Sequence, residues 1–372
     1  MNESPQQLAT NCLEVHGIPE RIPELDGLRG VAVLVVVLHH ISQSFPEGAV
    51  GGTLRLWLAV THAGWTGVDI FFALSGFLIT RILLGTRNRP HYYRNFYARR
   101  VLRLMPPYLI MLVLIATLVP GSGRFLALSV VYLANFSALF GIPMSYGPLW
   151  SLAIEEHYYL IWPWLVRFLN RRVLAAVGIL LCFSTPVFRY YAQTHGFFNP
   201  YFSWFRFDGL MWGSLSAVVV TAPNSSRRII RWWSVTVGSI GAFIYVVGAM
   251  MGAMGRNSLL GSTIVFGAVA MATTGVIGLA ALGELRALWA PLRSRVLRYL
   301  GDISYWIYLI HALIVETACT LAKELIADRH LTVDWSVCLA ITAIVAVLVV
   351  ASGAMVRRWV EMPFLRLKQR FR

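Results

Sequence analysis

The stretch LDGLRGVAVLVVVLHH, residues 25–40, decides the fold class of this chain. After Arg29 it continues as an apolar run that ends at two histidines, and similar runs follow along the chain. In a helix, the eleven residues from Arg29 to His40 rise by about 16 Å, which places His40 near mid-bilayer if Arg29 lies at one membrane face. Ionisable groups at that depth face a bundle interior or a water-filled cavity, so His40 is a candidate for catalysis or proton transfer. The alternative is a histidine held by helix packing alone.

The composition indicates an integral membrane protein. Hydrophobic residues make up 57% of the 372 residues and charged residues 13%; the mean hydropathy is +0.64. These values are typical of a polytopic membrane protein. The formal net charge of +15 does not indicate nucleic acid as a partner, because the arginines cluster in short segments between apolar runs, as in cytoplasmic loops. The four cysteines have neither metal-ligand nor disulfide spacing, so we expect no metal site.

Ten apolar segments are long enough to be membrane-spanning helices. They lie near residues 30–46, 65–84, 102–119, 149–166, 173–190, 206–222, 232–250, 258–282, 303–322 and 335–356. A further apolar segment at 125–141 decides the topology. If it does not cross the membrane, all later arginine clusters lie on the same side as the N-terminus, as the positive-inside rule expects. If it crosses, they lie on the opposite side. We therefore expect an all-α polytopic helix bundle of about ten transmembrane helices, with 125–141 re-entrant or interfacial and both termini cytoplasmic.

The expected domain organisation is simple. Residues 1–24 form a polar cytoplasmic N-terminal tail, residues 25–364 one transmembrane domain and residues 365–372 a basic cytoplasmic C-terminal tail. Neither an internal repeat nor a hydrophilic insertion large enough for a second domain is visible. The first residues lack the charged and apolar regions of a removable signal peptide, so we expect the first span to direct insertion.

Arginines at the cytoplasmic ends of two spans indicate a site for a phosphorylated ligand. Arg29 begins the first span, while Arg100 and Arg103 begin the third, three residues apart and therefore on one helix face. A guanidinium can bind phosphate through two parallel hydrogen bonds. Simple anchoring of the helices by positive charge is the alternative, although Arg103 extends further into the apolar stretch than an anchor requires.

Titratable side chains from other spans reach the depth predicted for His40. Glu155 and Glu156 lie some six or seven residues into the fourth span from its outer end, and His311 lies about 12 Å into the ninth from the cytoplasm. Two histidines and a carboxylate at similar depth are the groups that general acid/base chemistry uses in a low-dielectric pocket. His40, Glu155, Glu156 and His311 are therefore the catalytic candidates.

Polar residues near the outer ends of two further spans are candidates for substrate contact. Asp69 and Ser75 belong to the second span, and Arg206 and Asp208 begin the sixth. Three of them have structural alternatives. Ser75 can bond back to its own helix, and Arg206 and Asp208 can form an ion pair or contact lipid headgroups. Gly76 is expected to allow close approach of a neighbouring helix.

Seven segments together resemble acyltransferase family 3. They are LDGLRGVAVLVVVLHH (25–40), GVDIFFALSGFLITR (67–81), NFYARRVLRLMPPY (95–108), WSLAIEEHYYL (150–160), FRFDGLMWG (205–213), LGDISYWIYLIH (300–311) and EMPF (361–364), in the order of the family and over nearly the whole chain. The family consists of integral-membrane enzymes that transfer acyl groups, usually acetyl, to hydroxyls of sugars and other carbohydrate-bearing molecules.

The resemblance matches individual residues. The family's pattern of Arg or Lys, ten residues and His falls on Arg29 and His40, its Arg-x-x-Arg on Arg100 and Arg103, and its Glu-rich motif on the two adjacent glutamates. The sequence departs from the family where His157 and Tyr158 replace the common Gln and Phe. His39 beside His40 is also unusual and leaves open which imidazole faces the site.

The resemblance implies a reaction and its partners. Acetyl-CoA or another acyl-CoA arrives from the cytoplasm as a co-substrate, no cofactor is bound permanently, and His40 takes the proton of an acceptor hydroxyl. The acceptor is a carbohydrate, a glycolipid or a glycosylated small molecule, and the location is the bacterial cytoplasmic membrane. A proton-coupled transporter or exporter of a small molecule is the alternative, which the lack of internal repeats and of matching broken helices disfavours.

Overall fold

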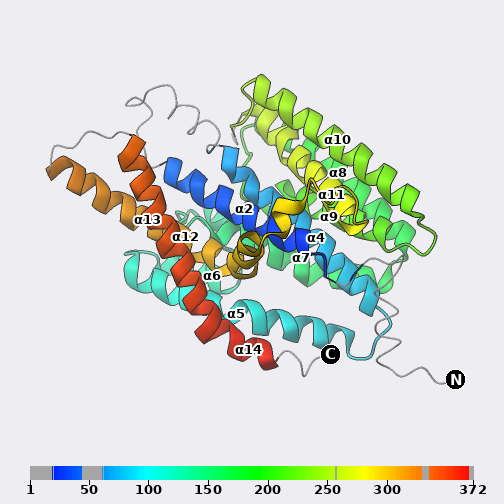
Figure 1. The fold of residues 1–372 in the computed structure, drawn as a ribbon, viewed down its shortest axis with the longest axis horizontal. Helices are drawn as coiled ribbons and strands as arrows, with labels where there is room; N and C mark the ends of the chain where they lie inside the picture. Colours follow the sequence, from blue (N-terminus) through cyan, green and yellow to red (C-terminus); the bar gives the residue numbers. More distant parts are fainter. Residues whose placement is uncertain are drawn as a thin grey trace. The chain divides into compact units, whose positions relative to one another are not determined.

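The computed structural model describes residues 19, 21–43, 61, 63–255, 258–328 and 335–367, and within these ranges every regular element is a helix (Figure 1). The α-helices are α2 (Pro23–Ser42), α4 (Gly67–Thr86), α5 (Tyr92–Leu118), α6 (Gly123–Val130), α7 (Leu149–Phe168), α8 (Arg171–Thr194), α9 (Phe207–Val220), α10 (Arg227–Met250), α11 (Phe266–Ala281), α12 (Arg295–Asp328), α13 (Trp335–Val356) and α14 (Met362–Leu367). Short 3-10 helices are η2 (Ala63–Thr66), η3 (Ala134–Phe140), η4 (Ser203–Phe205) and η6 (Ala290–Arg293), whereas η5 (Gly261–Val265) and η7 (Arg357–Glu361) are π-helical. The all-α prediction is confirmed.

All ten predicted spans coincide with helices. Eight helical stretches in the described part of the chain are long and apolar enough to cross a membrane: Pro23–Ser42, Ala63–Thr86, Tyr92–Leu118, Arg171–Thr194, Arg227–Met250, Gly261–Ala281, Arg295–Ala322 and Ser336–Leu367. The other two predicted spans are α7, which contains Glu155, Glu156 and His157, and the shorter α9 of 14 residues. The protein is a multi-pass membrane protein.

The segment at 125–141 does not form one helix. It divides into α6, of 8 residues, and η3, of 7 residues, separated at Tyr132, whose φ is 57°. The Tyr132 ring stacks on Tyr108 of α5, with 4.9 Å between centroids. Either piece extends over about 12–14 Å, which is less than half of the bilayer core. This agrees with the prediction that the segment is re-entrant or interfacial.

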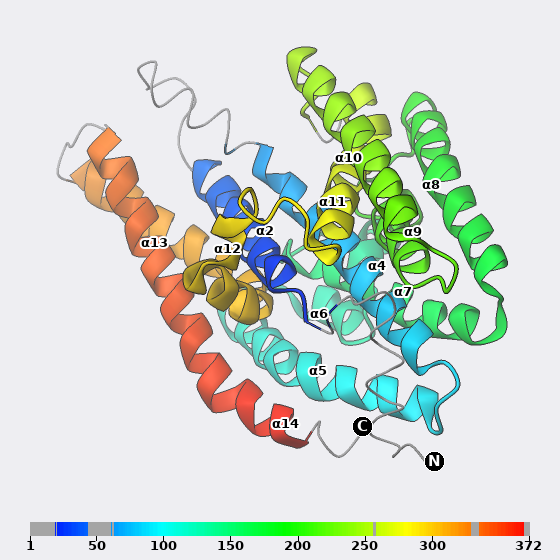
Figure 2. The ribbon, with the colours of Figure 1, turned by 45° about the vertical axis from the view of Figure 1, so that its right-hand side comes forward.

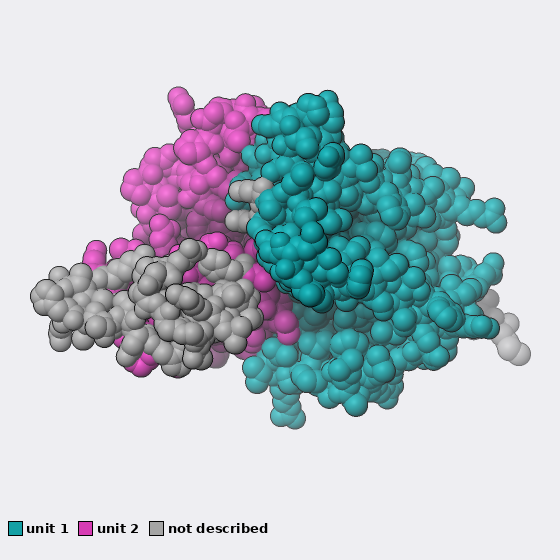
Figure 3. All heavy atoms as spheres, turned by 90° about the horizontal axis from the view of Figure 1, so that it is seen from above, with its two compact units in different colours: residues 1–28, 69–93, 150–298 teal, residues 29–68, 94–149, 299–372 magenta. Residues whose placement is uncertain are grey.

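The structure comprises two compact units, coloured separately in Figure 3. Unit 1 consists of residues 1–28, 69–93 and 150–298, and unit 2 of residues 29–68, 94–149 and 299–372. Unit 1 carries the candidate residues Asp69, Ser75, Glu155, Glu156, Arg206 and Asp208. Unit 2 carries the candidates Arg29, His40, Arg100, Arg103 and His311.

Small residues determine how helices pack inside unit 1. Figures 1 and 2 show α8, α9, α10 and α11 side by side, and these helices share extensive contacts. A Cβ atom on Gly76 of α4 would lie 1.9 Å from the Leu210 carbonyl oxygen of α9, and one on Gly213 would lie 1.9 Å from the Ala73 carbonyl oxygen. Because nothing larger than hydrogen fits, α4 and α9 cross with their backbones in contact, as predicted for Gly76.

Candidate active site

Two histidines from distant spans meet in unit 2. His40 of α2 and His311 of α12 have ring centroids 4.7 Å apart, with their planes at 76°. His311 is fully buried, and His40 is half-buried. The structure thus brings together the two imidazoles that the depth argument placed at one level. Their catalytic roles remain a prediction.

Backbone carbonyls fix which nitrogen of each imidazole is basic. His40 Nδ1 lies 2.9 Å from the Val36 oxygen, and His311 Nδ1 lies 2.7 Å from the Tyr308 oxygen. Since a carbonyl only accepts, both Nδ1 atoms carry a proton, and Nε2 is the basic nitrogen of each neutral ring. Among the described residues, His311 Nε2 is buried and has no hydrogen-bond partner. Such a nitrogen can take a proton from a bound molecule.

His39 is held differently from its neighbour. Its Nδ1 lies 3.2 Å from the Thr61 carbonyl oxygen, and its Nε2 lies 3.1 Å from Nε2 of Gln43. Nδ1–H therefore donates to the carbonyl, and Nε2 accepts from the Gln43 amide. Both nitrogens of this buried ring take part in hydrogen bonds within the protein. That His40 rather than His39 acts in the reaction remains a prediction.

The α12 turn that carries His311 is contacted by Tyr146. This phenol donates to the Leu309 carbonyl oxygen at 2.6 Å and accepts from the Leu313 N–H at 3.3 Å. Tyr146 is buried, and burial raises the pKa of its phenol, so the hydroxyl keeps its proton. Nothing in the sequence singles out Tyr146, because it follows no motif spacing and precedes an ordinary Gly-Pro turn.

The three candidate phosphate-binding arginines also belong to unit 2. Arg29 lies on the same continuous helix as His40, and eleven residues bring the helix to within about 20° of three full turns. Arg100 and Arg103 are half-buried on α5, and the Arg100 guanidinium lies 5.7 Å from the Phe96 ring centroid. A single face of α2 therefore leads from Arg29 to His40.

A hydrogen bond links the arginine-bearing helix to the histidine-bearing helix. Tyr305 of α12 donates to the Leu104 carbonyl oxygen of α5 at 3.1 Å. Leu104 directly follows Arg103, and Tyr305 precedes His311 by six residues, or about 9 Å of helix. The contact fixes the level of the α5 arginine pair relative to His311.

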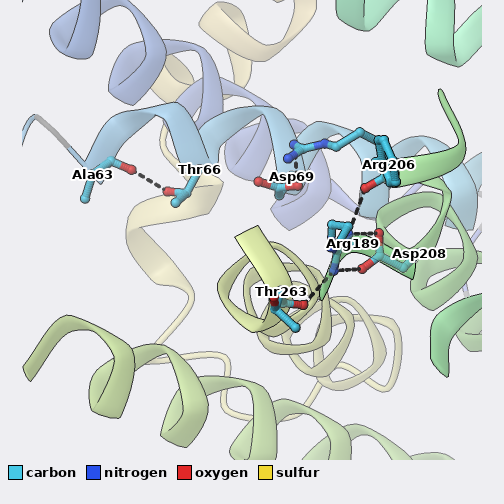
Figure 4. A network of polar contacts seen from close by, with 8 residues as sticks. Ala63, Thr66, Asp69, Arg189, Arg206, Asp208 and Thr263 are labelled. Atoms are coloured by element: carbon cyan, nitrogen blue, oxygen red, sulfur yellow. Dashed lines mark hydrogen bonds and ion pairs between the residues drawn. The ribbon is translucent and has the colours of Figure 1, made fainter. Parts of the chain in front are cut away.

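Unit 1 contains two buried ion pairs (Figure 4). Arg189 is completely buried and donates to both carboxylate oxygens of Asp208, at 2.8 and 2.7 Å, and to the carbonyls of Phe205 and Thr263, at 2.8 and 3.0 Å. Arg206 donates to Asp69 at 2.7 Å. Such a network satisfies charges that would otherwise be costly at this depth.

These contacts match the structural alternative for Arg206 and Asp208, and they show Asp69 as a further ion-pair partner. Asp69, Arg206 and Asp208 all take part in ion pairs, and the Arg206 guanidinium also lies 3.9 Å from the Phe266 ring centroid. Their contact with substrate remains a prediction. Sequence reasoning missed Arg189, although an arginine inside the predicted span 173–190 was itself a signal.

A chain of hydrogen bonds connects Ser75 to Glu155. The Ser75 hydroxyl bonds the Tyr159 hydroxyl, which donates to Oε2 of Glu155 at 3.0 Å. Ser75 thus bonds a neighbouring helix, and Glu155 and Glu156 are half-buried on α7. Because these glutamates belong to unit 1, their meeting with the histidines of unit 2 remains a prediction. Within the described ranges, no three His, Cys, Asp or Glu side chains form a possible metal site.

Comparison with known proteins gives the family. The model of the acyltransferase domain, that of acyltransferase family 3, matches residues 22–355. The chain belongs to this family. The match includes all eleven candidate residues, so the resemblance read from the seven segments is confirmed.

Curated relatives of this family member include two bacterial proteins. The peptidoglycan O-acetyltransferase OatA of Listeria monocytogenes is 28% identical over 327 residues, covering 78% of this chain and 49% of the relative. The O-acetyltransferase OatA of Staphylococcus aureus is 31% identical over 179 residues, covering 41% of this chain and 26% of the relative. The chain thus spans about half or less of the length of these relatives. No solved structure shows significant similarity to it.

Proposed function

We propose that this protein is a membrane O-acetyltransferase that moves an acetyl group from acetyl-CoA in the cytoplasm to a hydroxyl of a carbohydrate. The observation that carries the proposal is the pair His40 and His311, whose basic Nε2 atoms belong to rings 4.7 Å apart. A family of acyltransferases needs a base to activate its acceptor, and imidazole is the usual one.

The donor is held by the arginines of unit 2. Arg29, Arg100 and Arg103 bind the phosphates of acetyl-CoA at the cytoplasmic surface through charge-assisted hydrogen bonds. The pantetheine arm is a thin chain of roughly 15–20 Å by the reach of an extended backbone. Its length fits the rise of about 16 Å from Arg29 to His40. Acetyl-CoA is a substrate that leaves as CoA, and no bound cofactor is required.

The chemistry is a direct acyl transfer. Nε2 of His40 takes the proton from the acceptor hydroxyl as its oxygen attacks the thioester carbonyl, the new C–O bond forms, and the C–S bond breaks. The proton then passes to the departing thiolate, which gives CoA. His311 Nε2 is the second base beside the reacting groups, and Glu155 and Glu156 remain predicted participants.

The names of the relatives guide the choice of acceptor. Peptidoglycan is the substrate named for the Listeria protein, so a peptidoglycan sugar hydroxyl is the first acceptor proposed for this chain. The residues proposed to bind the acceptor are Asp69, Ser75, Arg206 and Asp208. Ion pairs hold the side chains of Asp69, Arg206 and Asp208 in place. The enzyme lies in the bacterial cytoplasmic membrane with both termini cytoplasmic.

The test uses the purified protein in lipid nanodiscs with radiolabelled acetyl-CoA. Peptidoglycan fragments and a glycolipid are offered as separate acceptors. The expected result is an alkali-labile acetyl ester on the carbohydrate and one equivalent of free CoA thiol for each ester. Release of no thiol with any carbohydrate acceptor would contradict the proposed function.

A further inference from the structure

The Tyr146 hydroxyl bonds both partners of one backbone hydrogen-bond position in α12, the Leu309 carbonyl and the Leu313 N–H. In an uninterrupted α-helix, the Leu313 N–H donates directly to the Leu309 carbonyl four residues earlier. In α12, which is continuous through this turn, the phenol also accepts from that N–H and donates to that carbonyl. The hydroxyl is thereby bonded to both ends of the turn.

The two residues bonded by Tyr146 flank His311 in the sequence of α12. His311 lies two residues after Leu309 and two before Leu313, which corresponds to about 200° around the helix axis in either direction. Tyr146 therefore contacts α12 on the side opposite the imidazole. The other side of this turn carries His311, whose ring lies beside that of His40.

We propose that Tyr146 is a positioning residue for His311: its bridge between Leu309 and Leu313 holds the α12 turn so that the imidazole stays beside His40. The inference rests on the proposed acyl transfer, in which the two histidines perform the chemistry. Tyr146 is 4% exposed and lies in the loop before α7, outside every helix that bears a candidate histidine. The hydrogen bonds of its hydroxyl go to the α12 backbone, so the proposed effect on His311 is indirect.

The variant Tyr146→Phe isolates the hydroxyl. The ring keeps its packing, and the Leu309 carbonyl and Leu313 N–H can still bond each other, so no buried polar group loses its partner. The matched control is Tyr108→Phe, because the Tyr108 hydroxyl is also buried in unit 2 and also donates to a backbone carbonyl, that of Ser129, at 2.8 Å. That bond lies away from the turn carrying His311.

Both variants are assayed for acetyl transfer from acetyl-CoA. A small misplacement of a catalytic group costs roughly ten- to a hundredfold in rate, so kcat of Tyr146→Phe should fall by that factor. The KM for acetyl-CoA should stay unchanged, because the arginines are untouched. Tyr108→Phe should keep both constants. Equal kcat values for the two variants, or a change confined to KM, would overturn the positioning role.

A readout that needs no turnover separates this inference from the proposed function. In protein labelled at histidine with the NMR-active nitrogen isotope, His311 is assigned with the variant His311→Gln. Tyr146→Phe should shift the His311 nitrogen resonances, whereas Tyr108→Phe should leave them in place. Unshifted His311 resonances would overturn the positioning role. Failure of the wild-type protein to transfer acetyl would contradict only the proposed function.

Discussion

Replacing Arg100 or Arg103 by alanine should weaken the use of acetyl-CoA but not of a donor without phosphates. Both guanidiniums lie half-buried on one face of α5, and we expect each to bind a phosphate of acetyl-CoA. A hydrogen bond to a charged group contributes about 1.5–3 kcal/mol, and its loss should lower kcat/KM for acetyl-CoA roughly ten- to over a hundredfold. Lysine at either position should restore part of the loss, because it keeps the charge but not the fork of donors.

The assay compares acetyl-CoA with S-acetylpantetheine, which carries the same thioester without the phosphates. Wild-type protein should prefer acetyl-CoA. In each alanine variant that preference should shrink roughly ten- to over a hundredfold, while S-acetylpantetheine is used as well as by the wild type. The control is Arg94→Ala, because Arg94 is an exposed arginine of α5 that lies about 120° or more around the helix from the pair. An equal loss with both donors, or the same loss in the control, would refute the phosphate-binding role.

Two further predictions concern topology and stability. If 125–141 does not cross the membrane, reporter domains fused after Arg172 and at the C-terminus should both be cytoplasmic, and an extracytoplasmic C-terminus would overturn the ten-span arrangement. Asp208→Ala should lower the free energy of unfolding by about 3–5 kcal/mol, because it leaves the buried Arg189 charge uncompensated. Glu284→Ala removes a partner of the exposed Arg231 and should lower it far less, because solvent screens an exposed ion pair. Thermal unfolding in detergent measures both, and equal losses would contradict the importance of the buried network.

The sequence predicts the helices well because membrane insertion depends on local hydropathy. Each predicted apolar segment contains a helix, and the short α6 and η3 replace a continuous span at 125–141. The alignment of Arg29 with His40 follows from helix geometry alone, so it too is readable from the sequence. Gly76 is predictable for a similar reason, because a glycine within an apolar span indicates close helix approach.

Features that depend on contacts between distant segments are not readable in this way. Depth along a helix places His40 and His311 at one level, but only packing decides that their rings meet. The protonation of each imidazole depends on the backbone carbonyl its Nδ1 reaches, and the pairing of Arg189 with Asp208 depends on how two neighbouring helices pack. Hydropathy contains no information on any of these contacts.

The central claim is that the imidazole of His40 is the general base of acetyl transfer. Parallel rate measurements on His39→Ala and His40→Ala test it most directly. His39→Ala loses two structural hydrogen bonds, about 1–3 kcal/mol of stability in total, but should keep the transfer rate per folded molecule. His40→Ala should remain folded and lose about a hundredfold to ten-thousandfold in rate, the usual effect of removing a general base. The rates are measured with radiolabelled acetyl-CoA and normalised to folded protein. A His40→Ala variant that transfers acetyl at nearly the wild-type rate would contradict the mechanism.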